Sequence, residues 1–143
     1  MTVQYDHGQP ILLIDDNDDD VEATLRAFKR TNFKNTVMRA ATGAEGLAML
    51  RERRVMPGLI LLDLNMPGLD GRRVLAILKG DNDLKRIPVV ILTTSADERD
   101  IEECYQLGAN TYIQKPVDLD GLFAAVQRLK DYWFEIALLP RES

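Results

Sequence analysis

The chain has 143 residues with a hydrophobic content of 45%, which is the length of one ordinary domain with enough apolar side chains for a core. A formal net charge of −5 at pH 7, with no basic stripe, argues against direct nucleic acid binding and against attraction to anionic membranes. One cysteine excludes an internal disulfide, and no apolar run approaches the roughly 18 residues of a membrane span, so we expect a cytoplasmic protein.

The first nine residues are polar and show no periodicity, and we interpret residues 1–9 as a flexible N-terminal arm. His7, the only histidine, lies in this arm without a neighbouring group that could fix its tautomer. We therefore expect His7 to be solvated and not catalytic. Residues 10–143 are interpreted as one domain, which ends in an apolar C-terminal extension over residues 131–143.

From Pro10 onward, short apolar runs alternate five times with amphipathic stretches of helical period. Several of these runs are continuously apolar, which is typical of parallel strands that are covered by helices on both faces. The pattern predicts an α/β fold, a (βα)5 doubly wound sheet with five parallel strands. The predicted strands are residues 11–14, 36–38, 59–62, 89–92 and 111–113.

Residues that favour helix N-termini precede each helical stretch, and basic residues follow several of them, as the helix dipole favours. The fifth stretch has one apolar face. The expected starts and ends are, in chain order, Asp18 or Asp19 to Arg30, Thr42 to residues 51–54, Asp70 to Lys79, residues 96–97 to Gly108, and Asp118 onward.

Polar residues directly follow four of the predicted strands. Ligands of an open α/β sheet bind beyond the carboxyl ends of its strands, where the strand order reverses. For the common order 2-1-3-4-5, that point lies between the first and third strands, which both end in carboxylates. We therefore expect one convergent site. Its members are Asp15 and Asp16 after the first strand, Asp63 after the third, Thr93 after the fourth and Lys115 after the fifth.

Three converging carboxylates require a cation to offset their repulsion. A hard divalent cation with oxygen ligands suits Asp15, Asp16 and Asp63, so the residues indicate Mg²⁺, with Mn²⁺ able to substitute. A lysine adds a point charge for phosphate, and a threonine hydroxyl can donate a hydrogen bond to the same group. Together these groups predict a phosphoryl site, in which a carboxylate is the nucleophile.

The motifs at these strand ends resemble the receiver-domain signature of two-component response regulators, over about residues 10–130. This resemblance implies a flavodoxin-like, CheY-like fold and a signalling domain that catalyses only its own phosphorylation and dephosphorylation and is not otherwise an enzyme. The motifs that carry it are ILLIDD at residues 11–16, LLDLNMPGLDG at 61–71, LTT at 92–94 and KP at 115–116.

The resemblance also implies a role for each site residue. Asp63 would accept a phosphoryl group from a histidine kinase, and Lys115 would pair with Asp63 and its phosphate. Thr93 would be the switch hydroxyl, chosen over Thr94 by its spacing from Lys115, and Tyr112 would be the aromatic residue that follows it inward. Mg²⁺ would bind Asp16, Asp63 and the backbone carbonyl of Asn65, and Asp15 would support it through water.

Simpler interpretations stand beside several of these roles. Asp18, Asp19 and Asp20 favour a helix dipole without any metal, which we prefer to an extended metal site. Tyr112 could equally be a strand aromatic that packs on a helix. Cys104 is expected to be a buried small hydrophobic residue. Whether the peptide bond before Pro116 is cis, as the family implies, does not follow from the sequence.

Three other functions compete with the receiver interpretation. A haloacid dehalogenase-type phosphatase would need an acid two residues after its nucleophilic aspartate, where this chain has Asn65. A flavodoxin-type FMN binder would need phosphate donors after the first strand, where Asp15 and Asp16 would repel a phosphate. A degenerate receiver that only binds partners would not need Asp16, Asp63, Thr93 and Lys115 together.

No effector domain is expected after the fifth helix, so output would pass through contacts with partners. Three neighbouring aromatic residues at 132–134 cannot all face one core, because successive helical residues are about 100° apart. With the apolar tail they predict a homodimer through the fourth helix, fifth strand, fifth helix and tail. The tail and the acidic start resemble small receivers that serve bacterial phytochrome-type histidine kinases.

Overall fold

A parallel sheet of five strands forms the centre of the molecule, in the order β2-β1-β3-β4-β5. The computed structural model describes residues 9–33 and 35–136, without the side chains of residues 134–136. The predicted α/β fold and strand order are confirmed. The strands are β1 (Ile11–Ile14), β2 (Val37–Ala40), β3 (Leu59–Leu62), β4 (Val89–Thr93) and β5 (Thr111–Gln114).

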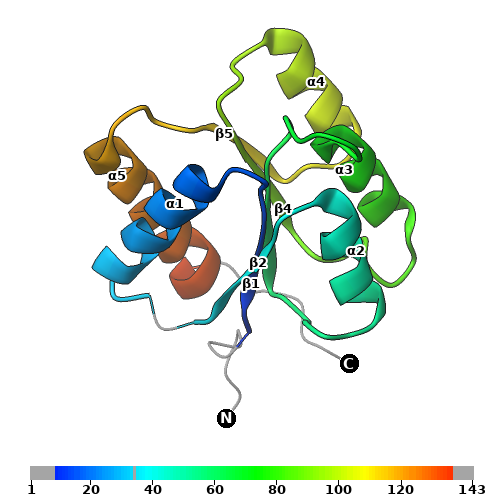
Figure 1. Cartoon of the computed structure of the whole chain (residues 1–143), viewed down its shortest axis with the longest axis horizontal. Coiled ribbons are helices and arrows are strands. Elements are labelled where there is room, and N and C mark those ends of the chain that lie inside the picture. Colours follow the sequence, from blue (N-terminus) through cyan, green and yellow to red (C-terminus); the bar gives the residue numbers. More distant parts are fainter. Residues whose placement is uncertain (1–8, 34, 137–143) are drawn as a thin grey trace.

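Helices cover both faces of the sheet: α1 and α5 lie on one side, and α2, α3 and α4 lie on the other (Figure 1). Because every connection between neighbouring parallel strands contains a helix, the chain returns to the same edge of the sheet before each strand begins. The helices are α1 (Asp18–Arg30), α2 (Gly43–Arg51), α3 (Gly71–Gly80), α4 (Glu98–Gln106) and α5 (Leu119–Lys130).

Alternate residues of each central strand enter two different hydrophobic cores. Leu12 and Ile14 of β1 pack under α2 and α3, whereas Ile11 and Leu13 pack under α1 and α5. This follows from the strand geometry, in which successive side chains point to opposite faces. Burial of each such aliphatic side chain is worth ~1.5–3 kcal/mol, so both cores hold the strand ends in place.

The strand boundaries differ from the prediction at three places. β2 begins one residue later and extends to Ala40, because Arg39 and Ala40 pair with Leu13 and Ile14 of β1. The guanidinium of Arg39 also donates to the carbonyl of Asp15 at 3.0 Å. β4 includes Thr93, and β5 includes Gln114, so Thr93, the expected switch hydroxyl, belongs to a strand and not to the loop after it.

Side-chain caps begin all five α-helices, and one predicted cap is wrong. Asn17, not Asp18 or Asp19, caps α1, because its side chain accepts a hydrogen bond from the backbone N–H of Asp20 at 2.9 Å. The caps at the other four helices fall where the sequence predicts them. These are Thr42 of α2, Asp70 of α3, Asp97 of α4 and Asp118 of α5.

The C-terminal extension begins with a π-helix, η1 (Asp131–Ile136), that continues from α5. Tyr132 is exposed, as the aromatic run predicts for at least one member, and Trp133 packs against the core under α5. The rest of the expected tail, residues 137–143, lies outside the described residues, as do residues 1–8 with His7. Gln9, the last residue of the expected arm, is buried, and its carbonyl accepts from the Asn35 side chain.

Cys104 is fully buried in α4, as expected for a small hydrophobic residue. Burial raises the pKa of its thiol to about 11, so the reactive thiolate is scarce at neutral pH. Within residues 9–33 and 35–136, no helix is both long and apolar enough to cross a bilayer.

Candidate functional site

Backbone hydrogen bonds at the strand ends fix the residues that the sequence places there. The N–H of Asp63 donates to the carbonyl of Ile14 at 3.0 Å, which joins the ends of β3 and β1. The N–H of Lys115 donates to the carbonyl of Thr93 at 2.6 Å, which joins the ends of β5 and β4. The backbones of Asp63, Thr93 and Lys115 are therefore held in fixed positions at the carboxyl ends of the strands, which is one edge of the sheet.

Three carboxylates from β1 and β3 gather at this edge. Asp15, Asp16 and Asp63 each offer an oxygen, and these oxygens lie within 4.8 Å of one another. Asp15 and Asp63 are buried, whereas Asp16 is half-buried and lies nearer the surface. The structure thus brings together the three carboxylates that the sequence assigns to a cation, and their oxygen chemistry suits a hard divalent ion.

Lys115 extends into this cluster and contacts more than one carboxylate. Its Nζ lies 2.7 Å from Asp15 Oδ2 and 3.8 Å from Asp63 Oδ2, so in this structure its primary partner is Asp15. Asp20 is the third partner, at 3.1 Å from the same Nζ. The sequence prediction put Asp20 with the helix-capping residues and missed this contact, because no spacing signal separates Asp20 from Asp18 and Asp19.

The buried surroundings change the ionisation of both Asp63 and Lys115. Burial raises the pKa of Asp63 above its ordinary value, the nearby Asp15 adds to this effect, and Lys115 and a hydrogen bond from Thr93 oppose it. Burial alone would lower the pKa of Lys115, but its hydrogen bond to Asp15 and the charges of Asp15 and Asp63 raise it overall. Lys115 therefore stays a cation and offsets part of the negative charge at Asp63.

The hydroxyl of Thr93 faces the carboxylate of Asp63. Thr93 is fully buried and its side chain hydrogen-bonds to Asp63, whereas the competing Thr94 is exposed. The side-chain amide of Asn65 lies 3.5 Å from the Thr93 hydroxyl, and the Asn65 N–H donates to Asp63 Oδ1 at 3.4 Å. Asn65 thus lies at the mouth of the site, between Asp63 and Thr93.

Tyr112 of β5 is half-buried and packs against the core under α4. Its hydroxyl donates to the carbonyl of Ser95 at 3.0 Å, in the loop that follows Thr93. Tyr112 therefore both packs on a helix and contacts the loop that follows Thr93. The two interpretations of Tyr112 are compatible in this structure.

The loop after Asp63 turns sharply at Gly68, which has a φ of 74°, in the left-handed region that glycine tolerates best. It returns to the strand at Gly71, whose N–H donates to the carbonyl of Leu64 at 3.0 Å. The chain bends closely here, because a Cβ on Gly71 would lie 2.2 Å from the carbonyl oxygen of Asp63. The described residues contain no cis peptide bond, so the bond before Pro116 is trans.

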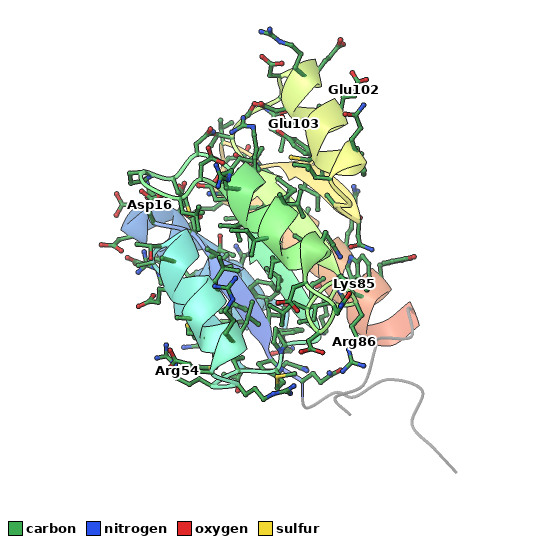
Figure 2. All side chains as sticks on the ribbon, turned by 90° about the vertical axis from the view of Figure 1, so that its right-hand side faces the viewer. Asp16, Arg54, Lys85, Arg86, Glu102 and Glu103 are labelled. Atoms are coloured by element: carbon green, nitrogen blue, oxygen red, sulfur yellow. The ribbon has the colours of Figure 1, made fainter. Side chains whose placement is uncertain are left out.

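Charge is distributed unevenly between the two ends of the molecule. Figure 2 shows Asp16, Glu102 and Glu103 toward one end, and Arg54, Lys85 and Arg86 toward the other. The helix ends add to this pattern, because acidic residues occupy the first turns of α1, α2, α4 and α5 and basic residues occupy the last turns of α1, α2, α3 and α5. The site lies at the acidic end.

Comparisons with known proteins agree with this geometry. A family model for the response regulator receiver domain matches residues 11–127. Response regulator Rcp1 of Synechocystis sp. is 40% identical over 135 residues, which cover 91% of this chain and 92% of Rcp1. The crystal structure of the Mn²⁺-bound form of Rcp1 has a TM-score of 0.86 and 38% identity, and the match covers 93% of this chain and 99% of that one.

A second solved structure is that of the phosphorylated cyanobacterial phytochrome response regulator RcpA. It is 40% identical with a TM-score of 0.88, and the match covers 94% of this chain and 99% of that one. The family match spans most of the sequence, including every residue of the site described above. The chain therefore belongs to the receiver domain family of two-component response regulators.

Proposed function

We propose that Asp63 is the phosphoacceptor of this receiver domain and that a histidine kinase supplies its phosphoryl group in a Mg²⁺-dependent reaction. The observation that carries this proposal is the position of Asp63, which is buried beside two further carboxylates, the Lys115 ammonium and the Thr93 hydroxyl. A nucleophile, a metal-binding set and two hydrogen-bond donors are thus within reach of one transferred group.

In the transfer, a carboxylate oxygen of Asp63 attacks the phosphorus of a phosphohistidine. The O–P bond forms, the P–N bond breaks, and the histidine of the donor leaves with the electron pair of that bond. Lys115 is held 3.8 Å from Asp63 Oδ2, from where its charge can pair with the phosphoryl oxygens. Thr93 can donate its hydroxyl hydrogen bond to the same group, so the residue would exchange its Asp63 partner for a phosphoryl oxygen.

The carboxylate cluster fits a divalent cation, and we assign its ligands as Asp16, Asp63 and the backbone carbonyl of Asn65, with Asp15 acting through water. A solved structure of Rcp1 contains Mn²⁺, which supports a divalent ion in this chain also. Bound Mg²⁺ would neutralise negative charge on the transferred phosphoryl oxygens. Buried Asp15 holds Lys115 in position, because one of its carboxylate oxygens accepts a hydrogen bond from Lys115 while the other accepts one from the N–H of Asn17.

The decisive experiment is intact-protein mass spectrometry after incubation with acetyl phosphate and Mg²⁺. Wild-type protein should gain the mass of one phosphoryl group, and the gain should disappear without a divalent ion or in Asp63→Asn. Asp81→Asn, a change of the same kind at the remote end of α3, should leave the gain intact. A folded wild-type protein that gains no mass would contradict the proposal and would favour a degenerate receiver that only binds partners.

The histidine kinase partner is proposed to be of the phytochrome type. The support is similarity to RcpA, described as a phytochrome response regulator, and to the bacteriophytochrome response regulator AtBRR, which is 40% identical over 94% of this chain. The cytoplasmic location follows from such a partner and stays a prediction. Phosphorylation would bias two arrangements of the α4–β5–α5 face through Thr93 and Tyr112.

A homodimer through the α4–β5–α5 face is the proposed output assembly. β5 is an edge strand, and an apolar groove of about 430 Å³ lies between it and the continuous α5 and η1 helices. The groove contains the exposed ring of Tyr132, and within residues 9–33 and 35–136 it is open to solvent, as apolar surfaces that associate are. Its lining residues are Thr111, Ile113, Ala125, Arg128, Leu129, Tyr132 and Trp133.

Light scattering tests this assembly at protein concentrations of tens of micromolar. Wild-type protein should have the mass of a dimer, and Tyr132→Glu should shift it toward the monomer, because a charge in the apolar groove opposes its burial. Leu25→Glu is the matched control, since Leu25 is an exposed apolar residue of α1 outside the groove. A monomeric wild-type mass under these conditions would contradict the homodimer.

A further inference from the structure

An ion-pair network connects α3 to α4 beside the site. The guanidinium of Arg72, at the start of α3, hydrogen-bonds to Asp100 of α4 and also lies 3.0 Å from Glu103. The Arg72 and Asp100 side chains are only 27% and 21% exposed, so their charges are partly desolvated. A half-buried, hydrogen-bonded arginine–carboxylate pair is stronger than an exposed one. The two helices are therefore linked at their N-terminal ends.

The same Asp100 carboxylate holds the loop that follows β4. Its second oxygen accepts a hydrogen bond from the Ser95 hydroxyl at 2.8 Å, and that hydroxyl in turn accepts from the N–H of Asp97 at 3.2 Å. The carbonyl of Ser95 accepts from the Tyr112 hydroxyl at 3.0 Å. Ser95 is thus held by a side chain of α4 and by a side chain of β5, only two residues after Thr93.

The other end of the network is anchored near the phosphoacceptor. Arg72 follows Gly71, and the N–H of Gly71 donates to the carbonyl of Leu64, the residue after Asp63. The start of α3 therefore moves with the end of β3. A continuous path of contacts runs from Asp63 through α3 and Arg72 to Asp100 and Ser95, and so back to Thr93 at the end of β4.

We propose that Arg72 and Asp100 are positioning residues for phosphoryl binding, because they hold Ser95, which lies two residues after Thr93 and accepts a hydrogen bond from the hydroxyl of Tyr112. We call the contacts of Arg72, Asp100 and Ser95 the α3–α4 bridge. This inference rests on the proposed phosphoacceptor role of Asp63 and adds to it a regulation of the same site. The side chains of the three bridge residues hydrogen-bond to one another and act on Asp63 only through the elements that they join.

The bridge acts by limiting the movement of one loop. Thr93 belongs to β4, so its backbone is fixed by the sheet. The residues after it lie in a loop, and Tyr112 keeps its hydrogen bond to the carbonyl of Ser95 only if that loop stays in place. Without Arg72, Asp100 loses its ion pair to α3. The Asp100 carboxylate that accepts the Ser95 hydroxyl is then no longer held in a fixed position. The loop then samples arrangements in which Tyr112 is released, and only part of the population can bind a phosphoryl group.

The test measures binding of beryllofluoride, a phosphoryl mimic, to the full chain at saturating Mg²⁺, using the ¹⁹F NMR signal of the bound ion. Arg72→Met, Asp100→Asn and Ser95→Ala should each weaken binding about tenfold, within the usual range of coupling between linked sites. The double variant Arg72→Met with Asp100→Asn should lose little more than either single variant, because both changes break the same path. Arg72→Lys should restore part of the affinity.

Two controls separate positioning from general damage to the fold. Arg99→Met removes an equal charge from α4, the helix of Asp100, at a side chain that pairs with Asp97 and not with a bridge residue, and it should bind like the wild type within twofold. Mg²⁺ affinity without beryllofluoride should be unchanged in all variants, since the carboxylate cluster stays intact. A destabilised fold would lower both affinities, and Ser95→Ala tests the loop contact without removing a charge.

The outcomes of this experiment are distinct. If the wild type gives no bound beryllofluoride signal, the phosphoacceptor proposal fails and the bridge fails with it. If the wild type binds and both Arg72→Met and Ser95→Ala bind equally well, only the bridge is overturned. Loss of beryllofluoride affinity at unchanged Mg²⁺ affinity supports the positioning role.

Discussion

Replacing Gly71 with alanine is expected to destabilise the fold by about 3 kcal/mol or more, as severe overpacking does. An added Cβ would lie 2.2 Å from the carbonyl oxygen of Asp63 and 2.6 Å from the Cα of Leu64, both of which are backbone atoms that cannot rotate away. Relief requires α3 to move off the end of β3. That movement would displace Asp63 itself, so the same change should also reduce phosphorylation.

Gly80 provides the matched control at the other end of the same helix. A Cβ there meets nothing within 4 Å, so Gly80→Ala should alter stability by no more than about 1 kcal/mol, and in the favourable direction of helix propensity. Urea unfolding followed by circular dichroism measures both variants. Equal midpoints for Gly71→Ala and the wild type would show that the close approach at Asp63 is not a constraint.

Removing the ammonium of Lys115 is expected to have the second large effect. Lys115→Met leaves the carboxylate of Asp15, which is 1% exposed, without its cation, and loss of one partner from a buried pair costs ~3–5 kcal/mol. Repulsion between Asp15 and Asp63 increases at the same time. The variant should therefore unfold at a lower urea concentration in metal-free buffer, and it should fail to gain a phosphoryl group from acetyl phosphate.

Added Mg²⁺ separates the charge effect in Lys115→Met from a packing effect. Because Lys115 and a divalent cation offset the same carboxylates, saturating Mg²⁺ should stabilise the variant more than it stabilises the wild type. Lys85→Met, at an exposed lysine of the opposite end, should respond to Mg²⁺ as the wild type does. An equal gain in unfolding midpoint for Lys115→Met and the wild type would contradict the electrostatic account.

The sequence predicts the sheet and the acidic cluster well because both follow from short patterns. A continuously apolar run such as residues 59–62 fits a strand covered on both faces, and a parallel sheet then brings the ends of all its strands to one edge. Asp15, Asp16 and Asp63 must converge once the strand order is given. Their proximity needs only topology and no detail of side-chain packing.

Contacts between distant surface elements could not be predicted in the same way. Arg72 and Asp100 belong to different helices and fit an ordinary solvated face, so no periodicity distinguishes them from other charged residues. Asp20 reaches Lys115 only because Asn17 takes the capping position and fixes where α1 begins. These choices depend on the relative placement of helices, which local sequence does not encode.

The uneven distribution of charge at the helix ends gives the molecule a long-range electric field. Carboxylates occupy the first turns of α1, α4 and α5, and each outweighs the partial positive charge, about half a unit, of its helix N-terminus. A small anionic donor diffuses toward Asp63 against this field, which salt screens beyond about 8 Å at physiological ionic strength. A donor protein with basic residues around its phosphohistidine would instead be steered toward Asp63. The basic residues at the other end of this molecule would repel the same donor, so they would help to orient it.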